Sequence, residues 1–544
     1  MVEKKYNNTY EKLYKNFKWE VPKYYNFGFD VVDKWAQDRT KLALISIDRT
    51  GKHDRYHTFY DLSMASNKFA NFLLKIGVKK VDRVLVILQS IPEWYISLIG
   101  MFKLGVVAIP GTVLLTAKDI EYRLNKSEAC MLLTDMDHAD IVESVKAKCP
   151  TLKYVMLVDG KRAGWYNYDE EMSESSNFLS EKDACQTLSI DPMLIYFTSG
   201  TTGHPKMVLH SHSYPLGHEV TAKFAQALTD KDLHWAVSET GWAKAAWGKL
   251  FGQMIVGAAI IQWETPGRFD ADGLLRAMEK YGVTTFCAPP TVYRMLIQMD
   301  LSKYALKLRH CMSAGEPLNP EVIRIWKKAF GLDIYDFYGQ TETVCVLSNF
   351  TFMPIKYGSV GKPTPGHDVK ILDDDGKEIG VNVEGNIAIY VDKNVRPPGL
   401  FKEYWKDKDL MKNAFRGNYY YTGDRGYKDE DGYFWFVGRD DDVIKSSGYR
   451  IGPFEVESAL IEHPAVAECA VVGVEDPQGV RGIVVKAVVV LSKGFKPSNT
   501  LTRELQEYVK KNTAPYKYPR IIEYVDELPK TISGKILRRK LRKN

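Results

Sequence analysis

Short apolar runs alternate with amphipathic stretches through the first 350 residues of the chain. Turn residues bound each run, and the stretches between the runs carry helical periodicity. This alternation is typical of open α/β sheets whose strands are mostly parallel. The clearest predicted strands are at 84–88, 154–158, 194–197, 258–262 and 284–288.

From about Gly358 the pattern changes to one of hairpins. Asp375-Gly376 and Asp431-Gly432 are dipeptides that favour tight β-turns, and both lie among runs with alternating apolar residues. This region is therefore predicted to be rich in β-hairpins. Its predicted strands are at 369–372, 386–391 and 433–437.

A small α+β pattern follows Arg439. The charged run 439–442 comes directly after a complete hairpin, and a chain of 544 residues is expected to form two or more cores. We therefore predict an N-terminal body at 1–438 and a C-terminal domain at 439–544. The predicted helices of this domain are at 454–462 and 501–511, and its predicted strands are at 469–474 and 484–491.

The composition is that of a soluble globular protein, with 45% hydrophobic and 26% charged residues. No run approaches the roughly twenty apolar residues of a membrane span. The N-terminus mixes Lys with Glu and has neither an apolar core nor Arg, so it predicts neither a secretory signal nor a mitochondrial presequence. The seven cysteines show no CxxC spacing, which argues against a disulfide framework or a zinc site. We therefore expect a cytoplasmic protein.

Positive charge gathers at the C-terminal end. Residues 439–544 contain 19 Lys and Arg against 14 Asp and Glu, a net charge of +5 out of +6 for the whole chain. Such a region could attract nucleic acid, a membrane surface or a small polyanion, or it could simply be a solvated face.

The strongest local signal is the segment YFTSGTTGHPK at 196–206. Its glycines allow the backbone to close around an anion, and its hydroxyls and amides can donate to phosphate oxygens. It is not a Walker A loop, because the GK[ST] ending is absent. Residue for residue it resembles the phosphate loop of the acyl-adenylate-forming superfamily. The matching residues are Thr198, Ser199, Gly200, Thr201, Thr202, Gly203 and Lys206.

Further motifs of that superfamily occur in order along the chain. The resemblance implies that Tyr338 stacks on adenine, Thr341 bonds the α-phosphate and Glu342 helps to hold Mg²⁺. It also implies that Asp424 and Arg439 bind the ribose. The other residues that it assigns to ATP or AMP are Gly315, Glu316, Pro317, Asp336, Phe337, Gly339 and Gln340.

The C-terminal domain resembles the mobile lid of this superfamily, and we call it the lid below. By that resemblance Asp441 is the hinge, and Lys535 is a catalytic lysine that acts with Thr341 and Glu342. Arg450 would reach the acyl-adenylate. The residues that the resemblance assigns to coenzyme A are Ser447, Gly448, Tyr449, Arg481, Tyr518, Pro519 and Arg520.

Three segments, at 239–242, 288–294 and 450–457, are similar to medium-chain acyl-CoA synthetases. The resemblance places Trp242, Gly339, Thr341 and Arg450 near the acyl group. In acetate-specific relatives a Trp stands at the position of Gly339, so a glycine there predicts space for larger acids. The alternative is that Trp242 or Trp247 fills this space, or that Gly339 serves a tight turn. The sequence departs from its relatives at Leu114, Lys244 and Lys249.

The resemblance implies an α/β enzyme with two α/β subdomains, a β-barrel-like part and the small α+β lid. Its implied reaction is the AMP-forming activation of a medium-chain, branched or aromatic acid, followed by transfer to coenzyme A. ATP, Mg²⁺ and coenzyme A are the expected cofactors. We expect no nucleic-acid partner and no membrane span, and a homo-oligomer is open. The alternatives are an acetate or propionate ligase, an adenylating enzyme with another acceptor, and a nucleotide-binding protein without activity.

Overall fold

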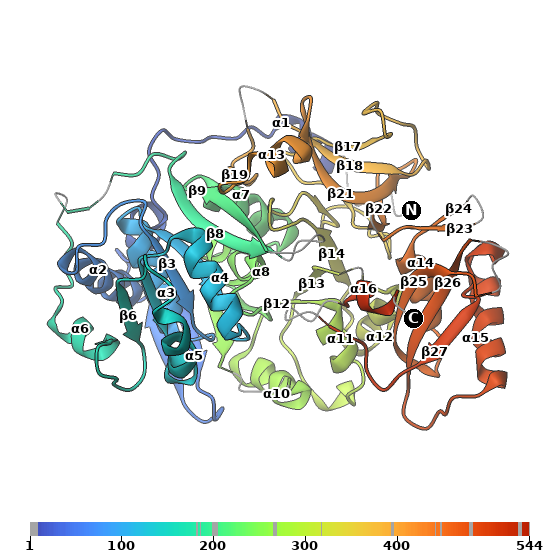
Figure 1. Cartoon of the computed structure of the whole chain (residues 1–544), viewed down its shortest axis with the longest axis horizontal. Coiled ribbons are helices and arrows are strands. Elements are labelled where there is room, and N and C mark those ends of the chain that lie inside the picture. Colours follow the sequence, from blue (N-terminus) through green and yellow to red (C-terminus); the bar gives the residue numbers. More distant parts are fainter. Residues whose placement is uncertain are drawn as a thin grey trace.

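The computed structural model describes residues 9–180, 183–184, 186–198, 205–264, 269–316, 318–392, 396–440, 442–446, 449–477, 482–530 and 536–542. Within these ranges the body contains three sheets, and a smaller sheet forms the centre of the lid (Figure 1). The sheets match the predicted α/β fold with a β-rich part and a small α+β domain.

The first sheet has eight strands in the order β19-β9-β8-β4-β3-β5-β6-β7. Its strands from β8 to β7 are parallel, and β9 and β19 close one edge in antiparallel pairing. The strands are β3 (Arg83–Ile87), β4 (Val107–Gly111), β5 (Met131–Thr134), β6 (Tyr154–Leu157), β7 (Tyr166–Asn167), β8 (Pro192–Thr198), β9 (Lys206–Ser211) and β19 (Glu403–Tyr404).

The second sheet has nine strands in the order β16-β15-β14-β13-β12-β10-β11-β1-β2. It too is parallel in the middle and antiparallel at its edges, as is common in large α/β sheets. The strands are β1 (Leu42–Ile47), β2 (Asp54–Thr58), β10 (Leu233–Ala236), β11 (Ala259–Trp263), β12 (Thr285–Ala288), β13 (His310–Ala314), β14 (Ile334–Tyr338), β15 (Leu347–Ser348) and β16 (Lys362–Pro363).

The third sheet is the predicted hairpin region, and its strands are antiparallel. Gly376 and Gly432 have φ angles of +85° and +81°, so the two Asp-Gly pairs do form turns that favour glycine. The strands are β17 (Val369–Leu372), β18 (Gly385–Tyr390), β20 (Phe415–Arg416), β21 (Tyr419–Lys428) and β22 (Phe434–Arg439).

The longer helices of the body pack around these sheets. They are α1 (Thr9–Asn16), α2 (Phe59–Lys75), α3 (Pro92–Lys103), α4 (Ala117–Ser127), α5 (Met136–Lys146), α10 (Ala271–Tyr281) and α12 (Pro320–Phe330). The shorter ones are α6 (Tyr168–Glu174), α7 (Tyr214–Val220), α8 (Ala243–Lys249), α9 (Phe251–Val256), α11 (Pro290–Leu296) and α13 (Lys408–Ala414).

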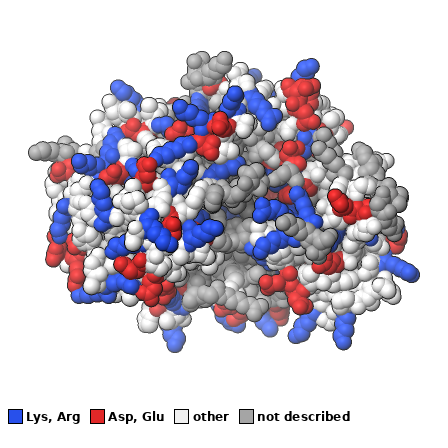
Figure 2. Space-filling view, viewed as in Figure 1, with Lys and Arg blue, Asp and Glu red and all other residues white. Residues whose placement is uncertain are grey.

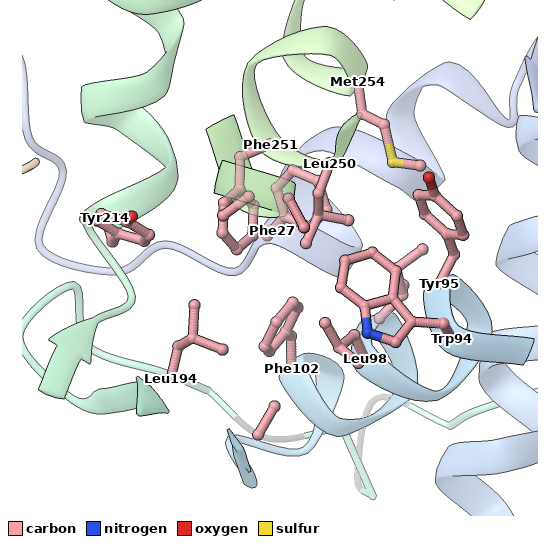
Figure 3. Packing of buried hydrophobic residues seen from close by; sticks show 14 of the residues in the cluster. Phe27, Trp94, Tyr95, Leu98, Phe102, Leu194, Tyr214, Leu250, Phe251 and Met254 are labelled. Atoms are coloured by element: carbon pink, nitrogen blue, oxygen red, sulfur yellow. The ribbon is translucent and has the colours of Figure 1, made fainter. Parts of the chain in front are cut away.

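The largest core lies between the first two sheets and is rich in aromatic side chains (Figure 3). Phe27 packs edge-on against Phe251, with ring centroids 4.9 Å apart, and Phe251 is also an edge-on neighbour of Tyr214 at 5.7 Å. Such edge-to-face pairs stabilise a core beyond the area that they bury. Because α7, α8 and α9 all contribute to this core, it fixes the helices that border the site described below.

The lid is built on the sheet β25 (Val466–Glu475), β26 (Ile483–Leu491) and β27 (Ile521–Tyr524). Its helices α14 (Pro453–Ile461) and α15 (Asn499–Asn512) share one core on one face of the sheet. A small cluster with Leu528 and the helix α16 (Arg538–Leu541) covers the other face. The predicted lid helices and strands are confirmed to within three residues.

The surface mixes charges of both signs. On the face shown in Figure 2, Lys and Arg side chains are interspersed with Asp and Glu over both the body and the lid. Among the described residues, no helix is long and apolar enough to cross a bilayer.

Candidate active site

The loop after β14 brings together residues that are distant in sequence. The Tyr338 hydroxyl and the Gln340 amide both donate to the same carboxylate oxygen of Asp424, the amide at 2.6 Å. Asp424 lies opposite Arg439 in the β21–β22 pairing, and the two side chains are 3.4 Å apart. Burial, together with the Asp424 carboxylate, raises the pKa of the Tyr338 phenol. The predicted adenine and ribose residues therefore form one hydrogen-bonded group.

A cavity of about 190 Å³ opens beside this group. Lys206 at the start of β9 and Glu342 both line it, as do Gln340 and Arg439. The Tyr404 hydroxyl donates to Glu342 at 2.8 Å, and the Lys206 ammonium lies 5.4 Å from the Tyr404 ring centroid. The cavity thus places two cations and a carboxylate within reach of a phosphate-bearing ligand.

The second segment predicted to bind the nucleotide, at the end of β13, runs beside β14. The strands are parallel, with Ser313 opposite Asp336, so their carboxyl ends meet at one edge of the sheet. Gly315 has a φ of +99°, and Glu316 accepts from the Thr291 hydroxyl at 3.0 Å. Neither Gly315 nor Glu316 lines the 190 Å³ cavity.

Asp336 and Phe337 are buried in β14 rather than exposed to the cavity. Burial raises the pKa of the Asp336 carboxyl to about 8, although the Leu318 amide donates to it. The raised pKa favours the uncharged carboxyl, which is a poor partner for a cation.

The space expected beside Gly339 is filled, and the prediction of an open space there is wrong. A Cβ atom at this position would lie 2.2 Å from the Val344 carbonyl oxygen and 2.5 Å from the Trp247 ring. Trp247 also stacks on Phe337, with ring centroids 6.1 Å apart. Glycine is needed at position 339 because a backbone and an aromatic ring both approach it closely. The structure agrees with the alternative in which Trp247 fills the space beside Gly339.

Trp242 lies at the N-terminus of α8, in a loop held against the end of β4. Glu239 accepts from the amides of Val113 and Gly241, at 3.1 and 3.2 Å. A second cavity, of about 240 Å³, adjoins this loop, and Lys249 lines it. Burial lowers the pKa of Lys249 to about 8, while the nearby Glu239 opposes this shift.

The lysines that depart from the relatives are engaged by the protein itself. Lys244 donates to the Ala314 carbonyl oxygen and Lys249 to the Ser90 hydroxyl, at 2.8 and 2.7 Å. Leu114 is exposed.

The residues predicted to bind coenzyme A that the structure describes lie on the lid, in two separate aromatic contacts. Tyr449, in β24 (Tyr449–Ile451), stacks on Tyr516 with ring centroids 4.1 Å apart. Arg520 donates to the Tyr518 hydroxyl at 2.6 Å and lies over its ring, and Pro519 accepts from Gln506. Several predicted residues lie outside the described ones: Ser199, Gly200, Thr201, Thr202, Gly203, Pro317, Asp441, Ser447, Gly448, Arg481, Lys535 and the side chain of Arg450.

Ion pairs hold the chain on both sides of the predicted hinge. On the body side, the buried Arg425 contacts Asp440 at 3.4 Å as well as Glu384 at 2.7 Å. On the lid side, Arg542 contacts Asp442 at 2.5 Å. Two backbone bonds, from the amides of residues 442 and 443 to the Arg439 carbonyl, cross the junction, both at 3.0 Å.

Sequence reasoning missed three side chains that contact the site. Tyr404 donates to Glu342, Tyr420 donates to Gln340 at 3.0 Å, and His210 lies 2.8 Å from the carbonyl oxygen of Thr341. Tyr420 directly precedes the predicted ribose motif, which is a signal that could have been used. Tyr404 and His210 carry no such signal.

The chain is similar along nearly its whole length to acyl-coenzyme A synthetases. It is 48% identical to the mitochondrial acyl-coenzyme A synthetase ACSM3 of Mus musculus, over 98% of this chain and 93% of that protein. It is 46% identical to the mitochondrial ACSM4 of Homo sapiens, over 96% of this chain and 91% of that protein. These mitochondrial relatives contradict the predicted cytoplasmic location. Cysteine usage indicates a reducing environment, which does not single out the cytoplasm.

Solved structures and family models agree with this likeness. The anthranilate CoA ligase AuaEII, in complex with anthranoyl-AMP, superposes with a TM-score of 0.87 at 31% identity, covering 96% of this chain and 97% of that one. A benzoate CoA ligase from Burkholderia xenovorans LB400 gives 0.83 at 28%, covering 95% and 100%. The AMP-binding enzyme family model matches residues 32–405, and that of the AMP-binding enzyme C-terminal domain matches residues 455–535. The chain therefore belongs to the AMP-binding enzyme family and is an AMP-forming acyl-coenzyme A ligase.

Proposed function

We propose that this ligase activates a carboxylic acid larger than acetate at the cavity between Lys206, Glu342 and Arg439. The supporting observation is the convergence of these charges with the Tyr338–Gln340–Asp424 group at the carboxyl end of β14. The Asp424 carboxylate is suited to accept the ribose hydroxyls of ATP. Lys206 and Arg439 offset phosphate charge, and Thr341 donates to the α-phosphate.

In the first half-reaction, a carboxylate oxygen of the acid bonds to the α-phosphorus. The bond from that phosphorus to the oxygen leading to the β-phosphate breaks, and pyrophosphate leaves. Negative charge grows on the phosphoryl oxygens, and Lys535, brought by the lid, offsets it. In the second half-reaction, the thiolate of coenzyme A attacks the acyl carbon and AMP leaves. Rotation at Asp441 exchanges the two arrangements of the lid, and Tyr449, Tyr518 and Arg520 then contact coenzyme A.

The residues present fit a magnesium ion. Among the described residues no three His, Cys, Asp or Glu side chains converge on one point, so a metal here would rely on substrate oxygens. Mg²⁺ is commonly held in this way, by one or two carboxylates and the phosphates of a nucleotide. Glu342 supplies such a carboxylate at the cavity wall. The bound ion would draw charge from the phosphate oxygens and so favour attack at phosphorus.

The acid is proposed to be medium-chain, branched or aromatic. The buried side chains of Ala243, Ala245, Ala246 and Trp247 offer an apolar wall after Trp242, and the partly buried Lys244 interrupts it. The relatives support an acyl substrate, and the two superposed ligases act on aromatic acids. Since Trp247 fills the place beside Gly339, the size limit on that side is set by Trp247.

The test is acid-dependent release of pyrophosphate with acetate, 2-methylbutyrate, octanoate and benzoate, each with and without coenzyme A. We expect AMP and acyl-CoA to form together, with acetate the poorest substrate. Release that does not depend on any acid would refute ligase activity. A preference for acetate would refute only the proposed acid class.

A further inference from the structure

His210 lies at the end of β9 and contacts the loop that carries the phosphate and metal residues. Its Nε2 is 2.8 Å from the carbonyl oxygen of Thr341, which lies between Gln340 and Glu342. A carbonyl oxygen can only accept, so Nε2 carries the proton and Nδ1 does not. Side chains two and four positions apart on a strand share a face, which places His210 on the same face of β9 as Lys206.

The imidazole ring is fixed by its neighbours. Tyr214, at the start of α7, stacks on it with ring centroids 3.7 Å apart and an interplanar angle of 27°. The Tyr214 hydroxyl accepts from the indole N–H of Trp247 at 3.2 Å. Figure 3 shows Tyr214 at one edge of the aromatic core. Because Trp247 also approaches the position of Gly339, one connected set of rings contacts the first part of this loop, at Gly339 and at Thr341.

The environment keeps this donor neutral. Burial lowers the pKa of His210 to about 3, although its bond to Thr341 opposes the shift, and Arg396 lowers it further. Nδ1 is buried without a hydrogen-bond partner in the part of the chain that the structure describes. A buried acceptor without a partner is unfavourable for folding, and such groups in native proteins invite a functional explanation.

We propose that His210 is a positioning residue for adenylation, which holds the Thr341 backbone so that Thr341 and Glu342 face the substrate. This inference rests on the proposed roles of those two residues. His210 itself touches neither the substrate nor the metal. Loss of its N–H would let the loop move, and a misplacement of about 1 Å can cost on the order of 100-fold in rate.

Two substitutions distinguish the effect of the His210 N–H donor from the effect of its stacked ring. His210→Phe keeps a stacking ring and removes the N–H, whereas His210→Gln loses the ring and keeps an amide N–H at a similar reach. His212→Phe is the matched control, because His212 is equally buried and neither of its ring nitrogens is bonded within the described residues. Each variant is assayed by thermal unfolding, by acid-dependent ATP–pyrophosphate exchange, and by thioester formation from supplied acyl-AMP.

We expect His210→Phe to lower kcat of the exchange by roughly 10- to 100-fold with KM for the acid nearly unchanged. Thioester formation from acyl-AMP should stay within about threefold of wild type, because no bond to phosphorus forms or breaks in that step and no extra charge on the phosphoryl oxygens has to be offset. His210→Gln should recover most of the exchange rate, and His212→Phe should match wild type.

The proposal is overturned if His210→Phe keeps the wild-type kcat, if both half-reactions fall equally, or if His210→Gln is no better than His210→Phe. If the Phe variant does not fold, His210→Asn replaces it. The shorter Asn side chain places its amide only where Nδ1 lies, so it cannot donate to the Thr341 carbonyl oxygen. Equal exchange rates for the Gln and Asn variants would then overturn it. A wild-type protein without acid-dependent exchange would refute the proposed function instead.

Discussion

Replacing Gly339 by alanine tests whether the conformation of the loop beside the Tyr338–Gln340–Asp424 group depends on close backbone contact at position 339. The added Cβ would meet the Val344 carbonyl oxygen at 2.2 Å and the Trp247 ring at 2.5 Å, and both distances are too short to persist. Overpacking of this kind typically lowers the free energy of unfolding by about 1–3 kcal/mol. Because Gly339 lies between Tyr338 and Gln340, the shift should also reduce the adenylation rate by roughly tenfold or more.

Urea unfolding and acid-dependent ATP–pyrophosphate exchange measure the two effects. The matched control is Gly380→Ala, because a Cβ there meets no atom within 4 Å, and its free energy of unfolding should stay within about 0.5 kcal/mol of wild type. Adding Trp247→Leu to the Gly339→Ala variant should restore little of the lost stability or exchange rate, because the clash with the Val344 carbonyl oxygen remains. A Gly339→Ala protein as stable and active as wild type would refute the reasoning, and full rescue by Trp247→Leu would show that the ring alone is limiting.

Four further results are expected. Trp247→Leu alone should raise kcat/KM for octanoate relative to acetate, by roughly 15- to 60-fold if two or three methylenes gain contact at about 0.8 kcal/mol each; an unchanged ratio would exclude Trp247 from the acyl site. Burial raises the pKa of Asp336 from 3.8 to about 8, so the folded protein keeps a proton that the unfolded chain releases, and stability should fall as pH rises between about 4 and 8. Asp336→Asn should make the urea midpoint less dependent on pH across that window, and an unaltered dependence would mean that another group is responsible. Lys535→Ala should abolish acid-dependent exchange but spare thioester formation from supplied acyl-AMP; equal losses would contradict its proposed role. Asp441→Pro should do the reverse, because proline fixes φ at the hinge, and normal overall turnover by that variant would argue against rotation there.

The regular elements were predictable because each depends on a local pattern. The run at 369–372 is strand β17, and the helix predicted at 501–511 is α15, only three residues longer. Apolar periodicity fixes which face of a segment is buried, and the Asp-Gly pairs fix the turns between strands.

The site was predictable only where its residues lie in contiguous motifs. Tyr338, Gln340 and Asp424 were chosen from two such motifs, and the structure brings them together. The contact of Trp247 with Gly339 joins segments about ninety residues apart in sequence, and that of His210 with Thr341 joins segments 131 apart. Neither contact leaves a periodic pattern in the sequence, because each depends on how segments that are distant in sequence pack against one another. The prediction of a cytoplasmic location was wrong for a different reason: amino-acid composition carries little information on the cellular compartment.

The ion pairs beside Asp441 bear on how much energy would separate the two arrangements proposed for the lid. Asp440 is bound to Arg425 of the body and Asp442 to Arg542 of the lid, so a rotation at the residue between them leaves each pair inside its own rigid unit. A rotation there would break the two backbone hydrogen bonds to the Arg439 carbonyl oxygen. Each bond contributes about 1 kcal/mol net, and water can replace it. The proposed hinge segment itself therefore contributes little to this energy, which depends more on contacts between lid and body, such as the bond from the Asn319 amide to the Ser458 carbonyl oxygen at 3.2 Å. The bound substrate, rather than the hinge segment, can then decide which of the two proposed arrangements is populated.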